Sequence, residues 1–159
     1  MRRLRPRAQA ERGVTLIESM VALTISAILM CSGLPAFTDY LRNAKLREAG
    51  NALLADALLA RSESIRRNGT VQLVTLGSSV TISYPGAASG VDRQRALPDD
   101  VSATASTISF GSDGSTPADA TVKMQLSGIE CSSSGVRCPV LQIDSGGGIR
   151  LCGDSTSCN

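Results

Sequence analysis

The stretch GVTLIESMVALTISAILMCSGLP, residues 13–35, decides how the chain folds at its start. From Val14 to Leu34 it runs for 21 residues without Lys or Arg and with one carboxylate, that of Glu18. At about 1.5 Å of rise per residue, this run forms roughly 31 Å of helix, which matches a bilayer hydrocarbon core of about 30 Å. We therefore expect residues 14–35 to form a transmembrane helix.

Glu18 is the unusual residue of this run. A carboxylate in the middle of a membrane helix costs roughly 2.5–3.5 kcal/mol, so an acidic residue there indicates a function and a specific partner. The alternative, an ordinary secretory signal, has an apolar core of only about 7–15 residues and ends at a small-x-small cleavage site. A lipoprotein signal is also disfavoured, because Met30 precedes Cys31 where a small residue is needed. We interpret Cys31 as a small apolar residue.

The charges are distributed unevenly around this segment. Five of the 16 basic residues and one of the 14 acidic residues precede Val14, which leaves 11 basic and 13 acidic residues for the rest of the chain. The formal net charge of +2 therefore comes from residues 1–13 and does not indicate a nucleic-acid-binding domain. The positive-inside rule places the N-terminus in the cytoplasm and the rest of the chain outside the inner membrane, in the periplasm.

Four of the five cysteines lie in the last 29 residues, on the exported side, and indicate two disulfides: Cys131, Cys138, Cys152 and Cys158. A zinc site is disfavoured because the chain has no His and the spacings, of six and five intervening residues, do not match structural zinc sites. A hairpin centred near Ser145 would pair Cys138 with Cys152 and leave Cys131 for Cys158. We favour this pairing over local pairing of consecutive cysteines.

Beyond the apolar run, the pattern predicts a second, amphipathic helical part over residues 36–68. Gly33 and Pro35 are expected to break or kink the helix between the two parts. The apolar stripe consists of Leu46, Leu53, Ala57 and Ala60, with Leu54, Leu58 and Ile65 beside it. The opposite face carries Arg42, Arg47, Glu48, Asp56, Arg61 and Glu63. Arg66 and Arg67 suit the last turn, and Gly69 suits the left-handed position after a helix that ends near Asn68.

The sequence of residues 69–159 predicts a β-sheet domain. Two β-prone runs at 70–76 and 80–84 predict a hairpin, and further runs lie at 107–110, 121–126, 139–144 and 149–152. Clusters of Gly, Ser, Pro and Asp separate them. The expected fold class is α+β, with a long N-terminal helix whose exported half packs on an antiparallel sheet.

The segment from Gly13 to Pro35 closely resembles the start of type IV prepilins and type II secretion pseudopilins. In that family a Gly precedes an apolar helix, and a Glu is the fifth mature residue. The resemblance implies a pilin-like fold and a leader, residues 1–13, that a prepilin peptidase removes between Gly13 and Val14 before Val14 is N-methylated. Glu18 and Pro35 become the fifth and twenty-second mature residues. Val14 departs from the usual Phe.

The same resemblance gives Glu18 a partner. The new ammonium group of Val14 lies at the head of an apolar helix, and Glu18 of a neighbouring subunit can neutralise it. In a low-dielectric filament core this pair fixes the axial register of the helices, and Thr15 and Ser19 can add hydrogen bonds.

The string ARSESIRRNGTVQL, residues 60–73, is similar to the GspH/FimT family, the minor pseudopilins of type II secretion and the related minor pilins of type IV pili. The resemblance implies a structural subunit of one of these filaments. The implied partners are the peptidase, other minor and major pilins or pseudopilins, and an inner-membrane assembly platform. No cofactor is implied. Taken singly, Arg61, Glu63, Arg66 and Arg67 fit a solvated helix face.

A DNA-binding minor pilin for natural transformation is one alternative. Residues 140–152 resemble the last hairpin of FimT-like pilins, which often carries Gly-Arg-x-Arg, but this chain has Gly147, Gly148, Ile149 and Arg150 and so lacks the first arginine. Arg150 and Lys123 are the candidate DNA contacts. Because phosphate binding scales with the number of cations, we favour a Gly-rich turn with an exposed Arg150.

Two further function classes can be considered. One is a signal-anchored periplasmic domain that never assembles, although such a domain has no use for Glu18. The other is an enzyme, which the sequence disfavours, because without His the Ser-His and Cys-His arrangements cannot be built. The glycines at 146–148 lack the strand-loop-helix context of a phosphate site. No metal or cofactor is expected.

Overall fold

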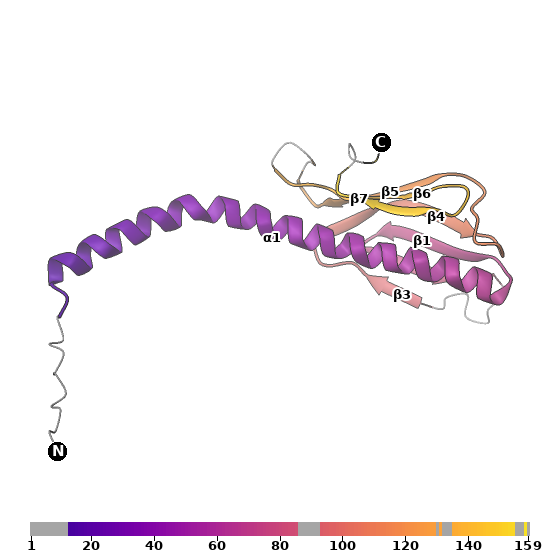
Figure 1. The fold of residues 1–159 in the computed structure, drawn as a ribbon, viewed down its shortest axis with the longest axis horizontal. Coiled ribbons are helices and arrows are strands. Elements are labelled where there is room, and N and C mark those ends of the chain that lie inside the picture. The colour runs from indigo at the N-terminus through magenta and orange to yellow at the C-terminus, as the bar shows by residue number, and fades with distance from the viewer. Residues whose placement is uncertain (1–12, 86–92, 130, 132–134, 155–157, 159) are drawn as a thin grey trace, which may run out of the picture. The chain divides into compact units, whose positions relative to one another are not determined.

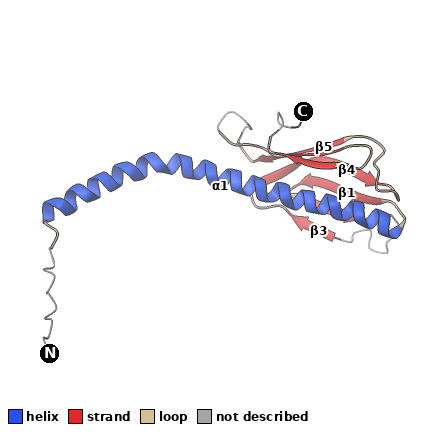
Figure 2. Ribbon diagram, in the orientation of Figure 1, coloured by secondary structure: helices blue, strands red, loops and turns tan. Residues whose placement is uncertain are grey.

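The computed structural model describes residues 13–85, 93–129, 131, 135–154 and 158. In this part of the chain one long helix is followed by a sheet of seven strands (Figure 1; Figure 2). The elements are α1 (Leu16–Arg67), β1 (Val71–Gly77), β2 (Ser79–Ser83), β3 (Arg93–Ala96), β4 (Val101–Phe110), β5 (Ala120–Leu126), β6 (Val140–Ile143) and β7 (Ile149–Cys152). The predicted α+β class is confirmed.

The helix α1 passes through Gly33 and Pro35 without interruption. The prediction was a break or a kink, and the structure shows no break in the helix at these residues. A proline removes one N–H donor and crowds the carbonyl four residues earlier, but the turns on either side keep their own hydrogen bonds and the helix continues. The chain nevertheless divides close to this point into two compact units, Met1–Phe37 and Thr38–Asn159.

The first part of α1 belongs to the smaller unit. From Leu16 to Cys31 all its side chains are exposed. Among the residues that the structure describes, no helix combines the length and the apolar character that a membrane crossing requires.

In the larger unit, α1 buries one stripe against the sheet. The buried apolar residues are Leu46, Ala49, Leu53, Ala57 and Ala60, whose spacing of three or four residues defines one helix face. The predicted stripe is confirmed, although Leu58 and Ile65 are about half exposed. Gly50 allows the close approach, because a Cβ there would lie 3.3 Å from side-chain atoms of Leu151 and Pro139.

The prediction that Asp56 lies on the solvated face of α1 is wrong. Its side chain is only 3% exposed, because it borders the buried stripe beside Ala57 and the edge strand β3 covers it. The guanidinium of Arg95 on β3 donates two hydrogen bonds to the carboxylate, at 2.7 and 3.0 Å. Arg93 lies farther away, with its Nε 3.9 Å from Oδ1 of Asp56. The pair therefore ties β3 to the helix.

The sheet is antiparallel throughout, in the order β3-β2-β1-β4-β5-β6-β7. The predicted β1–β2 hairpin is confirmed, with Leu73 opposite Ile82. Alternate residues of β1 and β2 are buried, as expected when one face of a sheet packs on a helix. The sequence does not predict β3, because RQRA has no β-branched residue and its one apolar residue is the small Ala96.

The helix ends at Arg67, as predicted, but Asn68 rather than Gly69 adopts the left-handed conformation. Asn68 has φ of 49°, its N–H donates to the carbonyl of Ile65, and the N–H of Gly69 donates to that of Ser64. These two bonds form a Schellman cap. Asn tolerates this conformation better than most residues do, since its short polar side chain can hydrogen-bond locally.

The four C-terminal cysteines form two disulfides, Cys131–Cys138 and Cys152–Cys158. The predicted pairing of Cys138 with Cys152 is wrong. In the β6–β7 hairpin Cys152 lies opposite Val140, two residues beyond Cys138, so the register does not bring the two cysteines together. Each disulfide instead closes a short local loop, with Cα atoms 5.6 and 5.4 Å apart.

Candidate functional site

The helix that carries Glu18 starts with a hydroxyl cap. Thr15 immediately precedes α1, and its Oγ1 accepts a hydrogen bond of 3.4 Å from the N–H of Glu18, the third helical residue. Threonine followed three residues later by glutamate is the capping-box spacing. From the sequence, both residues were expected to act in assembly, and this local contact was not predicted. The capping position also places the Glu18 carboxylate at the positive end of the helix dipole.

Behind this cap, α1 presents a long apolar surface. Large apolar side chains are exposed throughout residues 13–37. They are Val14, Leu16, Ile17, Met20, Val21, Leu23, Ile25, Ile28, Leu29, Met30, Leu34 and Phe37. Contiguous exposed apolar surface of this kind marks a protein or membrane interaction site.

The hydroxyl groups within this surface are bonded to the helix itself. The hydroxyl of Thr24 donates to the carbonyl of Met20, and that of Ser26 donates to the carbonyl of Ala22, both at 2.8 Å. Ser19 donates in the same way to the carbonyl of Thr15 at 3.2 Å. Such bonds reduce the cost of taking polar side chains into an apolar environment. Glu18 is the one carboxylate of residues 14–34.

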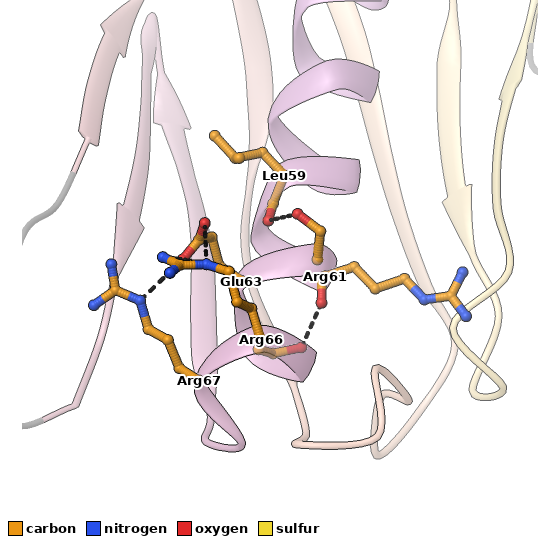
Figure 3. Close-up of polar contacts among 7 residues, drawn as sticks. Leu59, Arg61, Glu63, Arg66 and Arg67 are labelled. Carbon is orange, nitrogen blue, oxygen red and sulfur yellow. Dashed lines mark hydrogen bonds and ion pairs between the residues drawn. The ribbon is translucent and has the colours of Figure 1, made fainter.

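The string at residues 60–69 forms the last turns of α1 and its ion pairs (Figure 3). The Glu63 carboxylate accepts hydrogen bonds from the guanidinium groups of both Arg66 and Arg67. These bonds lower the pKa of Glu63, with the bond from Arg66 as the larger cause. Arg67 also lies 3.9 Å above the ring of Tyr84, just after β2. The string therefore secures the C-terminal end of the helix to the sheet.

Arg61 points away from this cluster, toward the C-terminal loops (Figure 3). It packs against two glycines with positive φ, Gly114 and Gly147, where an added Cβ would lie 3.1 Å from its Nε. That Nε is buried and has no hydrogen-bond partner within the described residues. Arg61 therefore supports two loops from the end of the helix, so it is not part of a plain solvated face.

The ion pairs of Glu63 make stability depend on pH. Because its pKa is lowered from an ordinary value of 4.5, its stabilising contribution is present above about pH 4.5 and is lost as the pH falls through the lowered pKa. Glu63→Gln should therefore lower the melting temperature at pH 7, and the difference from the native chain should shrink below pH 4.5. Circular dichroism melts of the detergent-solubilised chain measure this. Glu48→Gln is the control, and a Glu63→Gln difference that stays constant with pH contradicts the assignment.

Two family models match the chain. One, described as type II transport protein GspH, matches residues 49–156, which is more than half of the chain. The chain belongs to the GspH family. The other model, a prokaryotic N-terminal methylation motif, matches residues 9–30 and so includes Gly13, Val14, Thr15 and Glu18. The predicted GspH/FimT resemblance is thereby confirmed.

Proteins similar to this GspH-family chain include a fimbrial protein, a minor pilin and a minor pseudopilin. A fimbrial protein of Moraxella nonliquefaciens is 42% identical over 60 residues, and the match spans 38% of each chain. The crystal structure of the type IV minor pilin FimU of Pseudomonas aeruginosa has a TM-score of 0.58 at 19% identity and covers 70% of this chain and 91% of its own. The minor pseudopilin EpsH of the Vibrio cholerae type 2 secretion system has a TM-score of 0.56 at 14% identity, covering 69% and 97%. At these identities, the two structures confirm the pilin-like fold.

The two candidate DNA contacts of this GspH-family chain lie on β5 and on β7, the second strand of the last hairpin. Arg150 on β7 lies opposite Gln142, and Lys123 on β5 lies opposite Val140, so alternation puts both residues on the same sheet face. Arg150 is ion-paired to Asp144 of its own hairpin, at 3.3 Å. The pairing reduces the positive charge that a phosphate would meet, so the geometry does not favour the DNA-binding alternative.

Proposed function

We propose that this GspH-family chain is a minor pilin or pseudopilin, a structural subunit of a type IV pilus or of a type II secretion pseudopilus. The observation that carries the proposal is the uncovered apolar surface of α1 with its single carboxylate, Glu18. A surface of that length needs either lipid or neighbouring helices around it. The family and the descriptions of FimU and EpsH support a filament.

Processing comes first in this proposal. A prepilin peptidase removes residues 1–13 on the cytoplasmic face, between Gly13 and Val14, and the new amine of Val14 is methylated. The match to the methylation motif over residues 9–30 supports this step. Until assembly, residues 14–35 anchor the chain in the inner membrane with residues 36–159 in the periplasm, where the two disulfides are stable.

Assembly follows when an inner-membrane platform passes the subunit to other minor and major pilins or pseudopilins. The ammonium group of Val14 then lies at the positive end of a helix dipole, which is unfavourable until a carboxylate approaches. Glu18 of one subunit supplies that carboxylate to the next and fixes the axial register. The role is structural, and no step in it needs catalysis by this chain.

The cleavage step gives a direct test. Mass spectrometry of the chain from its own host should show a species that begins with methylated Val14. Gly13→Val, which places a branched side chain at the cleavage site, should accumulate the 159-residue precursor instead. A native chain that keeps Met1 would contradict the proposal and would favour a signal-anchored domain that does not assemble.

A further inference from the structure

We propose that a pocket beside the first turns of α1 in the larger unit binds an acidic side chain of a neighbouring pilin subunit. The pocket has a volume of about 280 Å³, and it is lined by Tyr40, Asn43, Arg47, Arg137, Pro139, Leu151 and Gly153. This volume is near the lower limit of roughly 300 Å³ for ligand sites, so it suits one or two side chains. The inference rests on the proposed function, because it needs a neighbouring subunit.

The charge of the pocket is not balanced from within. Arg47 on α1 and Arg137 in the loop before β6 are both exposed, and the part of the chain that the structure describes gives neither an ion pair. Other arginines on the domain have carboxylate partners, as Arg42 has in Asp39 at 3.1 Å. Two guanidinium groups that line one concave pocket fit a carboxylate, since each can donate charge-assisted hydrogen bonds.

The pocket is held in shape before any partner arrives. The amide of Asn43 donates to the carbonyl of Gly135 at 3.1 Å, and its oxygen accepts from the N–H of Arg137 at 2.8 Å. These bonds join α1 to the loop that the Cys131–Cys138 disulfide closes. Asn43 therefore holds the backbone of Arg137 beside α1, and this preorganisation lowers the entropy cost of binding.

A protein segment fits the pocket better than a nucleic acid does. Pro139 and Leu151 contribute apolar surface, which suits the stem of a Glu or the residue next to an acid. A DNA backbone instead needs a row of cations that follows successive phosphates, and here there are two in a small hollow. Subunits of this kind offer suitable groups, since Asp99, Asp113 and Asp119 of this chain are exposed loop carboxylates. In the sequence, Tyr40 of the pocket follows the exposed apolar residue Phe37 by three positions.

Photocrosslinking of the full-length chain in its own host tests this proposal. Tyr40→p-benzoylphenylalanine places the crosslinker on the pocket rim, and Phe37→p-benzoylphenylalanine reports assembly itself. The crosslinked peptides are identified by mass spectrometry. At Tyr40 we expect a pilin or pseudopilin peptide that contains Asp or Glu. Adding Arg47→Gln and Arg137→Gln should lower this yield roughly tenfold and spare the Phe37 crosslink, whereas Arg42→Gln should change neither.

The outcomes separate the two proposals. If Phe37 crosslinks to a subunit, three results at Tyr40 would overturn the pocket assignment alone. These are no crosslink, a crosslink to a peptide that lacks acidic residues, and a crosslink to DNA. A Tyr40 crosslink that is unaffected by Arg47→Gln and Arg137→Gln would do the same. Absence of any subunit crosslink at Phe37 would overturn the proposed function, and the pocket assignment with it.

Discussion

Glu18→Gln should exclude the chain from filaments while leaving it in the membrane. Removing one partner of a buried charge pair costs about 3–5 kcal/mol, which corresponds to a fall in incorporation of roughly a hundredfold or more. Insertion into the membrane should improve, because the amide is less costly there than a carboxylate. Immunoblots of sheared filaments and of membrane fractions measure the two quantities.

Glu18→Gln removes the negative charge of the side chain but keeps its capping role at the start of α1. Glutamine at the third helical position still fits the capping box with Thr15, so the start of α1 should be preserved. Ser26→Ala is the matched control, since its hydroxyl donates to the carbonyl of Ala22 in the same helix. A Glu18→Gln chain that enters filaments as abundantly as the native chain would refute the register role of Glu18.

The largest effect on stability is expected from Arg95→Ala. It leaves the Asp56 carboxylate, 3% exposed, with only Arg93 at 3.9 Å. A buried charge left without its partner costs about 3–5 kcal/mol, and we expect about 3 kcal/mol because Arg93 can move closer. Urea unfolding followed by circular dichroism measures the free energy.

Arg93→Ala is the control for this prediction. Arg93 is 49% exposed and does not hydrogen-bond to Asp56, so its removal should cost less than about 1 kcal/mol. Equal losses for Arg93→Ala and Arg95→Ala would show that the bidentate pair does not hold β3 against the helix.

Periodic patterns made most of the fold predictable. Leu46, Leu53 and Ala57 recur with the helical period, and each is fully buried. Two β-prone runs after Gly69, separated by a short Gly-Ser segment, predicted the β1–β2 hairpin. Glu18, at the start of α1, could also be singled out from the sequence, because an isolated carboxylate in an apolar run is rare and energetically costly.

Features that depend on distant contacts were not predictable. The burial of Asp56 requires β3, a polar strand that only its place in the sheet reveals. The predicted pairing of Cys138 with Cys152 depended on the register of the β6–β7 hairpin, which places Cys152 opposite Val140. The pocket between Asn43 and Arg137 joins residues 94 positions apart. Local rules also compete, as when Asn68 takes the left-handed position that Gly69 was expected to take.

The most direct measurement of the central claim is zero-length crosslinking of purified filaments with a carbodiimide, which joins an amine to a carboxylate in contact with it. We predict an amide between the Val14 amine and a neighbouring subunit's carboxylate, or between Glu18 and a neighbouring subunit's N-terminal amine, identified by mass spectrometry. Links between Val14 and Glu18 of the same chain only, or no link from either residue, would contradict the account.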